Sequence, residues 1–257
     1  MTVARVLIVA GSDSGGGAGI QADIKTVTMF GGHALTAITA LTAQNTLGVQ
    51  AVMPVPADFV IAQIDSVVSD IGVDAVKIGM IGSAATANAV AERLSGLDVP
   101  IVFDPVMIAT SGSHLANADT IAAFERLMMI ATLVTPNAPE LEALGGVDAV
   151  VAHGCHLVAK GGHIPGPRVI DRLISPTGQL LREIDCARIE TDDSHGTGCT
   201  FATALATGLA QGKPIDEAFA TAIRFVRMAL INAPGLGAGH GPMGHSLGYK
   251  PFMELEG

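Results

Sequence analysis

The segment Val6-Leu-Ile-Val-Ala10-Gly-Ser-Asp-Ser-Gly15-Gly-Gly-Ala-Gly19-Ile20 joins a short apolar run to a glycine-rich stretch, and a helical pattern follows at Ile20–Phe30. An apolar run without alternation is typical of a strand that is covered on both faces. Further runs of this kind follow at Ala75–Ile78, Ile101–Phe103, Leu133–Thr135 and His156–Ala159. Helical patterns occur at Asp58–Asp70, Ala84–Leu94, Ala118–Met129, Glu140–Leu144, Cys199–Gln211 and Ile215–Ile231. This alternation predicts an α/β fold with a mostly parallel central sheet and right-handed crossovers.

Two early segments have a different pattern. His33–Ala43 alternates between apolar and polar residues, and Val49–Pro54 is a second strand candidate close behind it. We expect this pair of strands to form either a lid or a dimer edge by strand pairing. Near the other end, Pro234–Pro242 is rich in glycine and proline and is predicted to be a loop. Since the sequence has no internal repeat and no low-complexity linker, we expect residues 1–257 to form a single domain.

The bulk composition excludes several classes of protein. The 257-residue chain has a formal net charge of −10 and no basic block, so it would mostly repel a nucleic-acid backbone or an anionic membrane. The apolar run Val6–Ala10 is too short for a signal-peptide core or a membrane span. The cysteines Cys155, Cys186 and Cys199 stand at unrelated spacings, which predict neither a disulfide framework nor a metal site. We therefore expect a cytoplasmic protein that binds small molecules.

Polar or glycine-rich segments directly follow the predicted strands. In an open parallel sheet, ligands bind in the crevice beyond the carboxyl ends of the strands. The segments in question are Gly11–Gly19, Gly79–Gly82, Asp104–Met107, Pro136–Glu140 and Lys160–His163. We expect them to gather along one rim of the sheet and to form the ligand site there.

The glycine-rich segment Gly11–Gly19 matches neither of the common phosphate-binding fingerprints. A P-loop ends in Gly-Lys-Ser or Gly-Lys-Thr, whereas this segment runs into Gly-Ile-Gln. A dinucleotide-binding fold would place an acidic residue at the tip of the second strand, where this chain has Gln44 and Asn45. A tight strand-to-helix turn and a ligand cradle therefore remain as alternatives for this segment.

The segment His195-Gly-Thr-Gly-Cys199 runs directly into the predicted helix Cys199–Gln211. A loop that opens into a helix brings unpaired backbone N–H groups and the positive end of the helix dipole together, which favours an anion. Both features would also favour the thiolate, so we expect the Cys199 thiol to ionise more easily than a free cysteine. The alternative is a glycine turn followed by a cysteine that serves only in packing.

Three charged side chains at the predicted rim suit a phosphate or a metal ion. Lys160 follows an apolar strand and precedes two glycines, where a cation can neutralise a phosphate, unless it is simply a solvated lysine. Asp104 ends another strand, and Glu140 lies where a helix begins. Glu140 by itself is more typical of a helix cap, but next to Asp104, Lys160 and the Cys199 loop the two carboxylates suit Mg²⁺. The scattered histidines, such as His153 and His156, lack the spacing of a zinc site and are expected to be structural.

Seven motifs, taken together and in order, closely resemble the hydroxymethylpyrimidine/phosphomethylpyrimidine kinases of thiamine biosynthesis, which belong to the ribokinase-like superfamily. The motifs are Ala10–Lys25, Ile38–Thr46, Lys77–Met80, Asp104–Met107, Thr135–Glu140, Lys160–His163 and His195–Thr200. The resemblance extends over nearly the whole chain. It implies a three-layer α/β/α fold and a phosphotransferase that transfers the γ-phosphoryl group of MgATP to 4-amino-5-hydroxymethyl-2-methylpyrimidine and then to the resulting monophosphate.

The resemblance also implies roles for particular residues. The candidate catalytic residues are Cys199, which would accept the proton of the alcohol, and Gly196, Thr197 and Gly198, which would form the anion hole. Gly11, Asp23, Gln44 and Met80 would line the pyrimidine site, with Gln44 bonded to the aminopyrimidine edge. Lys160, Asn137, Glu140 and Asp104 would face ATP, and Asp104 and Glu140 would hold Mg²⁺ through water. The resemblance favours a homodimer and leaves open whether a monovalent cation is required.

Two departures from the family pattern affect the expected site. The connection from Glu140 to Lys160 is short, so the crossover is expected to be a short helix or an irregular segment near Val147–His153. Asp192 and Asp193 precede His195 where the family has a lysine and an asparagine, and they oppose ATP binding unless they point away or hold a cation. Two alternatives to the pyrimidine kinase follow. One is a pyridoxal or pyridoxine kinase, and the other is a non-catalytic ligand-binding module with the same fold.

Overall fold

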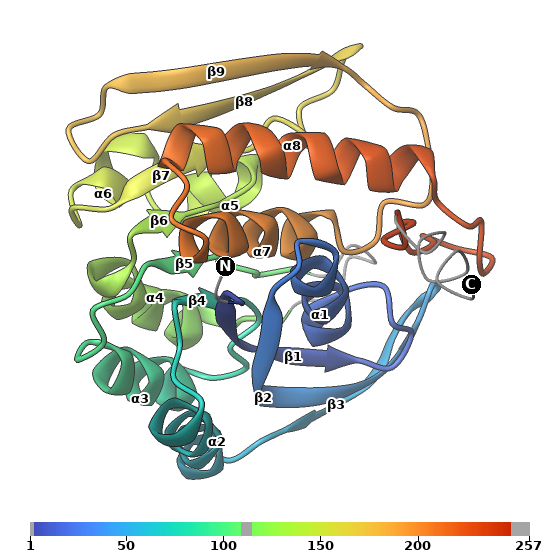
Figure 1. Cartoon of the computed structure of the whole chain (residues 1–257). Coiled ribbons are helices and arrows are strands. Elements are labelled where there is room, and N and C mark those ends of the chain that lie inside the picture. The colour runs from blue at the N-terminus through green and yellow to red at the C-terminus, as the bar shows by residue number, and fades with distance from the viewer. Residues whose placement is uncertain (1–2, 109–114, 248–257) are drawn as a thin grey trace, which may run out of the picture.

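The computed structural model describes residues 3–108 and 115–247 (Figure 1). Its strands form one sheet in the order β3-β2-β1-β4-β5-β6-β7-β8-β9. The strands are β1 (Arg5–Asp13), β2 (His33–Asn45), β3 (Gly48–Pro54), β4 (Ala75–Ile78), β5 (Ile101–Phe103), β6 (Leu133–Val134), β7 (His156–Ala159), β8 (Arg168–Ile174) and β9 (Leu180–Ala187). The central strands are parallel to one another, in the order β2, β1, β4, β5, β6 and β7. The outer strands are antiparallel: β3 pairs with β2, β8 with β7, and β9 with β8. The mostly parallel sheet is confirmed.

Helices cover both faces of this sheet, which confirms the three-layer α/β/α architecture (Figure 1). The helices are α1 (Gly19–Met29), α2 (Ala57–Asp70), α3 (Ala84–Leu94), α4 (Ala118–Ile130), α5 (Ala138–Ala143), α6 (Val147–Val151), α7 (Thr197–Ala210) and α8 (Ile215–Ile231). One apolar core lies between the sheet and helices α2, α3, α4 and α6. The other core lies between the opposite face and helices α1, α7 and α8. The parallel strands β1, β4, β5, β6 and β7 are therefore buried along most of their length, as the non-alternating apolar runs predict.

Helix α7 is buried almost all round. Its residues from Thr200 to Gly208 are all buried, and it packs against both α1 and α8. A helix that is apolar on every side belongs in the interior. The N-terminus of α7 is consequently fixed at the rim of the sheet, close to the carboxyl ends of β4 and β5.

The antiparallel pair β8 and β9 is absent from the sequence-based expectations. Both strands carry charged residues at short intervals, and most side chains of β9 are exposed. The predicted short crossover helix is confirmed as α6, and Pro234–Pro242 lies outside the helices and strands, as expected. Among the described residues, no helix is long and apolar enough to cross a membrane.

Strand β3 forms one edge of the sheet, where it pairs with β2 as a hairpin. Most of its side chains are exposed, among them Val52 and Met53. The outer edge of β3 is thus available for a lid or for strand pairing. The homodimer expected from the family stays a prediction.

Candidate active site

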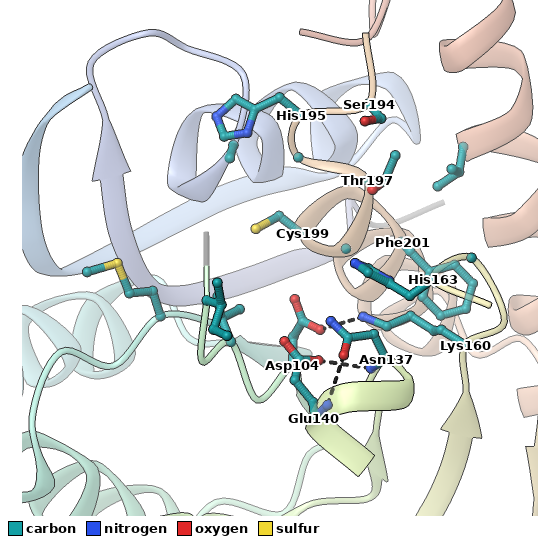
Figure 2. Close-up of a pocket in the computed structure, with 18 of the residues that line it drawn as sticks. Asp104, Asn137, Glu140, Lys160, His163, Ser194, His195, Thr197, Cys199 and Phe201 are labelled. Atoms are coloured by element: carbon teal, nitrogen blue, oxygen red, sulfur yellow. Dashed lines mark hydrogen bonds and ion pairs between the residues drawn. The ribbon is translucent and has the colours of Figure 1, made fainter. Parts of the chain in front are cut away.

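A cavity of about 920 Å³ opens along the carboxyl ends of the parallel strands (Figure 2). Each of the five segments predicted to gather at this rim contributes to its lining, through Gly11, Met80, Asp104, Glu140 and Lys160 among others. The start of α7 closes one side of the cavity, with Cys199 directed into it (Figure 2). A cavity of this size suits a nucleotide together with a small substrate. The predicted ligand rim is confirmed as a cavity.

The turn that enters α7 depends on Gly196. This residue has the left-handed conformation, with φ of +86°, and a Cβ atom there would collide with the carbonyl oxygen of Gly17. Only glycine satisfies both conditions. Within the described part of the chain, the N–H groups of Gly198 and Cys199 make no hydrogen bond, whereas that of Thr197 contacts the Ser194 carbonyl at 3.3 Å. The first turn of α7 therefore presents free donors to the cavity.

The Cys199 thiol is half-buried and contacts the cavity. Burial raises its pKa to about 11, although the nearby Lys77 ammonium and a hydrogen bond from the Gly19 backbone act to lower it. The expectation of an easily ionised thiol is therefore wrong, because the desolvation of the sulfur outweighs the helix dipole and the N–H donors. At neutral pH the sulfur is a thiol.

Asp104 and Lys160 form an ion pair next to the first turn of α7. Lys160 Nζ lies 2.9 Å from Asp104 Oδ1, which also accepts a hydrogen bond of 3.0 Å from Thr135. An added Cβ at Gly198 would lie 3.4 Å from Lys160 Nζ and 3.5 Å from Asp104 Oδ2. Burial lowers the pKa of Lys160, but the carboxylates of Asp104 and Glu140 raise it by more. A protonated ammonium group thus stands beside the free N–H donors of α7.

Asn137 and Glu140 form a capping box at the start of α5. The Asn137 side chain accepts a 2.9 Å bond from the Glu140 N–H, and the Glu140 carboxylate accepts one of the same length from the Asn137 N–H. Both residues also line the cavity. Burial and the nearby Asp104 raise the pKa of Glu140 to about 7, against the opposing effect of Lys160. Glu140 therefore caps α5 and also lies at the site, although the two roles were expected to be alternatives.

Asp23 does not line the cavity, so its predicted place in the pyrimidine site is wrong. Its side chain is fully buried, and its Oδ2 lies 2.8 Å from Nζ of the fully buried Lys77. Its Oδ1 accepts a 2.6 Å bond from Thr203, one helical turn beyond Cys199. Although burial lowers the pKa of Lys77, the carboxylates of Asp23 and Asp104 act to raise it, and it stays above its usual value. The carboxylate is held below the site by Lys77 instead of reaching into it.

The other predicted residues of the pyrimidine site do reach the cavity. Gly11, Gln44 and Met80 all contribute to its lining. A Cβ atom at position 11 would lie only 2.9 Å from Met80 Sδ, so the glycine lets the thioether come close to the backbone. These three residues form the end of the cavity nearest to β1 and β2.

Several cavity residues were missed by the sequence analysis. Asp13 and His195 are buried and lie 2.9 Å apart through Asp13 Oδ2 and His195 Nε2. At the opposite end, Asp171, Arg188 and Arg227 come from β8, the segment after β9, and α8. Asp13 and His195 lie inside motifs that the sequence already shows, and Arg227 lies in a predicted helix. Asp171 and Arg188 depend on β8 and β9, whose sequence pattern gave no signal.

The acidic pair Asp192 and Asp193 does not contribute to the cavity lining. Asp192 is exposed, and the Asp193 carboxylate lies against Gly241. Both side chains therefore point away from the site. In this orientation they are not expected to oppose ATP binding.

A segment near the C-terminus braces the start of α7. The His195 N–H donates to the Gly241 carbonyl at 3.1 Å, and Thr200 Oγ1 lies 2.8 Å from His245 Nε2. Burial lowers the pKa of His245 to about 4, so its ring is neutral and can accept the hydroxyl proton of Thr200. The Gly241–His245 segment thus holds the loop that contains Gly196.

Comparison with known proteins places the chain in a family. Residues 13–244 match the phosphomethylpyrimidine kinase family model. The chain is 46% identical to the thiamine biosynthesis bifunctional protein ThiED of Geobacter sulfurreducens over 94% of its own length, and it spans about half (52%) of that longer relative. It is 44% identical to the hydroxymethylpyrimidine/phosphomethylpyrimidine kinase of Rhizobium meliloti, covering 94% of this chain and 97% of the relative.

A solved structure is similar as well. The pyridoxal kinase from Staphylococcus aureus in complex with AMP-PCP and pyridoxal superposes with a TM-score of 0.84 at 30% identity, over 95% of this chain and 94% of that one. The fold is therefore ribokinase-like. Given the family match over most of its length, the chain belongs to the phosphomethylpyrimidine kinase family.

Proposed function

We propose that the protein is an ATP-dependent kinase that phosphorylates 4-amino-5-hydroxymethyl-2-methylpyrimidine and then its monophosphate, in thiamine biosynthesis. The observation that carries this proposal is the convergence of three groups on one cavity: the N–H donors of α7, the Asp104–Lys160 pair, and the Cys199 thiol. A phosphoryl group needs neutralisation and fixed donors, whereas the alcohol needs a proton acceptor. The family relatives carry the same activity in their names.

The nucleotide would occupy the end of the cavity formed by β8, β9 and α8. Apolar side chains line this end, among them Val169, Ile189, Val226 and Leu230. A flat purine ring suits such surroundings. The guanidinium groups of Arg188 and Arg227 also line it and can meet ribose or phosphate oxygens.

The phosphates would lie between Lys160 and the first turn of α7. The Lys160 ammonium and the free N–H groups of Gly198 and Cys199 can each donate to phosphate oxygens. Charge stabilisation of this kind dominates phosphoryl transfer, because the transition state is loose.

Mg²⁺ fits the donor set at this place. Asp104 and Glu140 are the carboxylates of the phosphate end, and Mg²⁺ is commonly held by one or two carboxylates together with substrate phosphates and water. Among the described residues, no cluster of three or more potential ligands offers a complete protein cage. We propose that Asp104 and Glu140 hold the ion through water, where it would neutralise the charge of the phosphates.

Cys199 would take the proton of the substrate hydroxyl. As the oxygen–phosphorus bond forms and the bond to the ADP leaving group breaks, the hydroxyl proton passes to Cys199 Sγ. Only the ionised sulfur can accept it, and with a pKa of about 11 that fraction is small at pH 7. The rate is expected to rise with pH for this reason.

An ADP-release assay tests the function. We expect the protein to release ADP with the hydroxymethylpyrimidine and with its monophosphate, and to do so poorly with pyridoxal. Release with pyridoxal alone would assign the pyridoxal kinase activity of the Staphylococcus aureus relative instead. Binding of the pyrimidine without any ADP release would identify a non-catalytic module.

Replacing Lys160 by methionine is expected to raise the KM for ATP about 10- to 100-fold and to leave the KM for the pyrimidine nearly unchanged. A hydrogen bond from a charged donor contributes about 1.5–3 kcal/mol, which corresponds to that change. Steady-state kinetics with each substrate varied in turn measures it. Lys213→Met, at a lysine outside the cavity, is the matched control. An unchanged KM for ATP in Lys160→Met would remove Lys160 from the phosphate site.

A further inference from the structure

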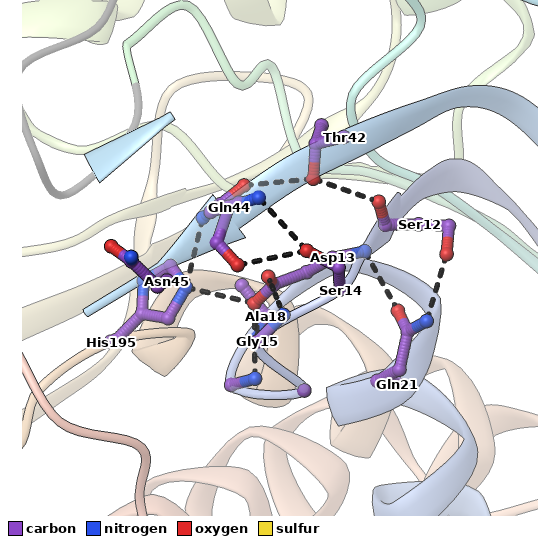
Figure 3. Close-up of polar contacts among 12 residues, drawn as sticks. Ser12, Asp13, Ser14, Gly15, Ala18, Gln21, Thr42, Gln44, Asn45 and His195 are labelled. Carbon is purple, nitrogen blue, oxygen red and sulfur yellow. Dashed lines mark hydrogen bonds and ion pairs between the residues drawn. The ribbon is translucent and has the colours of Figure 1, made fainter. Parts of the chain in front are cut away.

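The side chains of Asp13, His195, Gln44 and Thr42 form a continuous polar chain at the pyrimidine end of the cavity (Figure 3). His195 Nε2 lies 2.9 Å from Asp13 Oδ2 and 3.1 Å from Nε2 of the Gln44 amide. The amide oxygen of Gln44 lies 3.1 Å from Thr42 Oγ1. The Gln44 amide therefore has a fixed neighbour at each end. Whether each neighbour donates or accepts a hydrogen bond decides which end of the amide faces it.

Asp13 is an ionised carboxylate. Its two oxygens accept hydrogen bonds from the backbone N–H groups of Gly15, Gly17 and Ala18, at 2.8 to 3.0 Å. Burial acts to raise its pKa, but these bonds and the contact with His195 lower it by more. A carboxylate can only accept, so the nitrogen that faces it must carry a proton. His195 is consequently protonated at Nε2.

Thr42 settles the other end of the amide. Its hydroxyl lies 3.0 Å from the backbone carbonyl oxygen of Ser12, which can only accept. A hydroxyl has a single proton, and this one is used on Ser12. Toward Gln44 the hydroxyl is then an acceptor and needs an N–H group opposite it.

We propose that Asp13, through His195, holds the Gln44 amide with its oxygen toward His195 and its nitrogen toward Thr42, and that this orientation selects a 4-aminopyrimidine over a 4-oxopyrimidine. A rotation of the terminal amide by 180° about its last side-chain bond reaches this state and exchanges the two ends shown in Figure 3. In that state the Nε2 proton of His195 is shared between Asp13 Oδ2 and Gln44 Oε1, and the amide N–H points to Thr42. Shared bonds of this kind are common in proteins. In this arrangement each hydrogen bond among the four side chains joins a donor to an acceptor.

In this orientation Gln44 presents its oxygen at one end and its N–H at the other to a substrate in the cavity. After the two contacts, one N–H and one oxygen lone pair of Gln44 remain for the cavity that the residue lines. A 4-aminopyrimidine matches this edge, since its amino group can donate to the oxygen and its neighbouring ring nitrogen can accept from the N–H. A 4-oxopyrimidine presents a carbonyl and a ring N–H in the same places. Its carbonyl would then face the Gln44 oxygen, and its ring N–H would face the Gln44 N–H. The inference rests on the proposed function, which supplies the aminopyrimidine.

The same direction positions the reacting group. The carbon that bears the hydroxymethyl group is adjacent to the carbon that bears the amino group, on the side away from the paired ring nitrogen. With the amino group at the His195 end of Gln44, the hydroxymethyl group therefore lies on the side of the segment that leads from His195 to Cys199. The reversed pose would direct it toward Thr42. His195 is thus a positioning residue that acts through Gln44.

The test compares kcat/KM for 4-amino-5-hydroxymethyl-2-methylpyrimidine with that for the 4-oxo analogue. We expect the wild-type protein to prefer the amino compound by about 100-fold or more, because a mismatch leaves buried polar groups unpaired. In His195→Ala and in Thr42→Val this preference should fall about tenfold. The ratio is informative because both compounds carry the same hydroxymethyl group, so damage to the phosphoryl-transfer groups cancels. A purely structural role of His195 would lower both rates together.

Two further variants sharpen the test. His195→Gln retains an N–H donor and should restore much of the preference, whereas His33→Ala, at an exposed histidine at the start of β2, should keep the wild-type ratio. Unchanged ratios in both His195→Ala and Thr42→Val would overturn the proposal, as would an equal fall in His33→Ala. Dissociation constants measured by calorimetry give the same ratio without turnover. If the wild-type protein binds the amino compound preferentially but releases no ADP, the kinase activity is refuted and the proposed orientation of Gln44 is still supported. If it binds neither compound, both are refuted.

Discussion

Replacing Cys199 by alanine is expected to lower kcat about 10²- to 10⁴-fold, with little change in the KM for ATP. The range is that of a general base, and the loss stays below that of the whole catalytic effect because charge stabilisation and positioning persist. Steady-state kinetics at saturating pyrimidine measures it. Since the pKa of the thiol is raised to about 11, the ionised fraction grows about tenfold with each pH unit below that value. The kcat of the wild-type protein should therefore rise through pH 9, whereas the profile of Cys199→Ala should be flat above about pH 8, where Glu140, with its pKa of about 7, is already ionised.

Two replacements at the same position act as controls. Cys199→Ser is nearly isosteric, but its hydroxyl ionises far less readily than a thiol, so it should lose about as much activity as the alanine variant. Cys199→Asp supplies a carboxylate that is ionised at neutral pH, so it should recover activity relative to alanine and lack the rise with pH. A wild-type profile that is flat from pH 7 to pH 9, or an unchanged kcat in Cys199→Ala, would remove the sulfur from proton transfer.

Replacing Lys77 by methionine is expected to lower the free energy of unfolding by about 3–5 kcal/mol. The ammonium group of Lys77 and the carboxylate of Asp23 are both fully buried and lie 2.8 Å apart. Removal of one partner leaves an uncompensated charge in the interior, which costs more than the pair itself contributes. Denaturant unfolding followed by circular dichroism measures the loss.

A surface pair of the same length provides the comparison. Arg168 and Asp185 also lie 2.8 Å apart, but about half of each side chain is exposed. Arg168→Met should therefore cost less than about 1 kcal/mol. The double variant Lys77→Met with Asp23→Leu removes both buried charges and should regain much of the stability. A Lys77→Met protein within about 1 kcal/mol of wild type would contradict the buried ion pair.

The buried parallel strands were predictable because their sequence has a simple physical cause. A strand covered on both faces is apolar at most positions, and β4, β5 and β7 begin and end where the apolar runs do. The buried exception in β4 is Lys77, whose charge is paired with Asp23. Helices α3 and α8 likewise have the bounds that their patterns predict. The strands β8 and β9 escaped notice because they form an exposed antiparallel hairpin at the sheet edge. There the side chains meet water, and charged residues are tolerated at almost any position.

The candidate site was predictable in its outline, since the carboxyl ends of parallel strands must meet at one edge. What could not be foreseen was how deeply each group is buried. The position of Cys199 at a helix start favours the thiolate, but the desolvation that raises its pKa depends on packing from remote parts of the chain. Asp23 was misplaced for a similar reason, since it lies on α1 and its partner Lys77 comes from the distant strand β4.

The brace formed by Gly241–His245 has a consequence for the integrity of the site. It belongs to no helix and to none of the sheet strands, yet it supports the turn at Gly196 from outside through His195 and Thr200. The two main hydrophobic cores consist of residues outside this segment, although Met243 and His245 within it are buried. A protease that cuts ahead of Gly241 would thus remove the outer support of the anion-binding turn while both main cores stay in place, so that inactivation would precede unfolding.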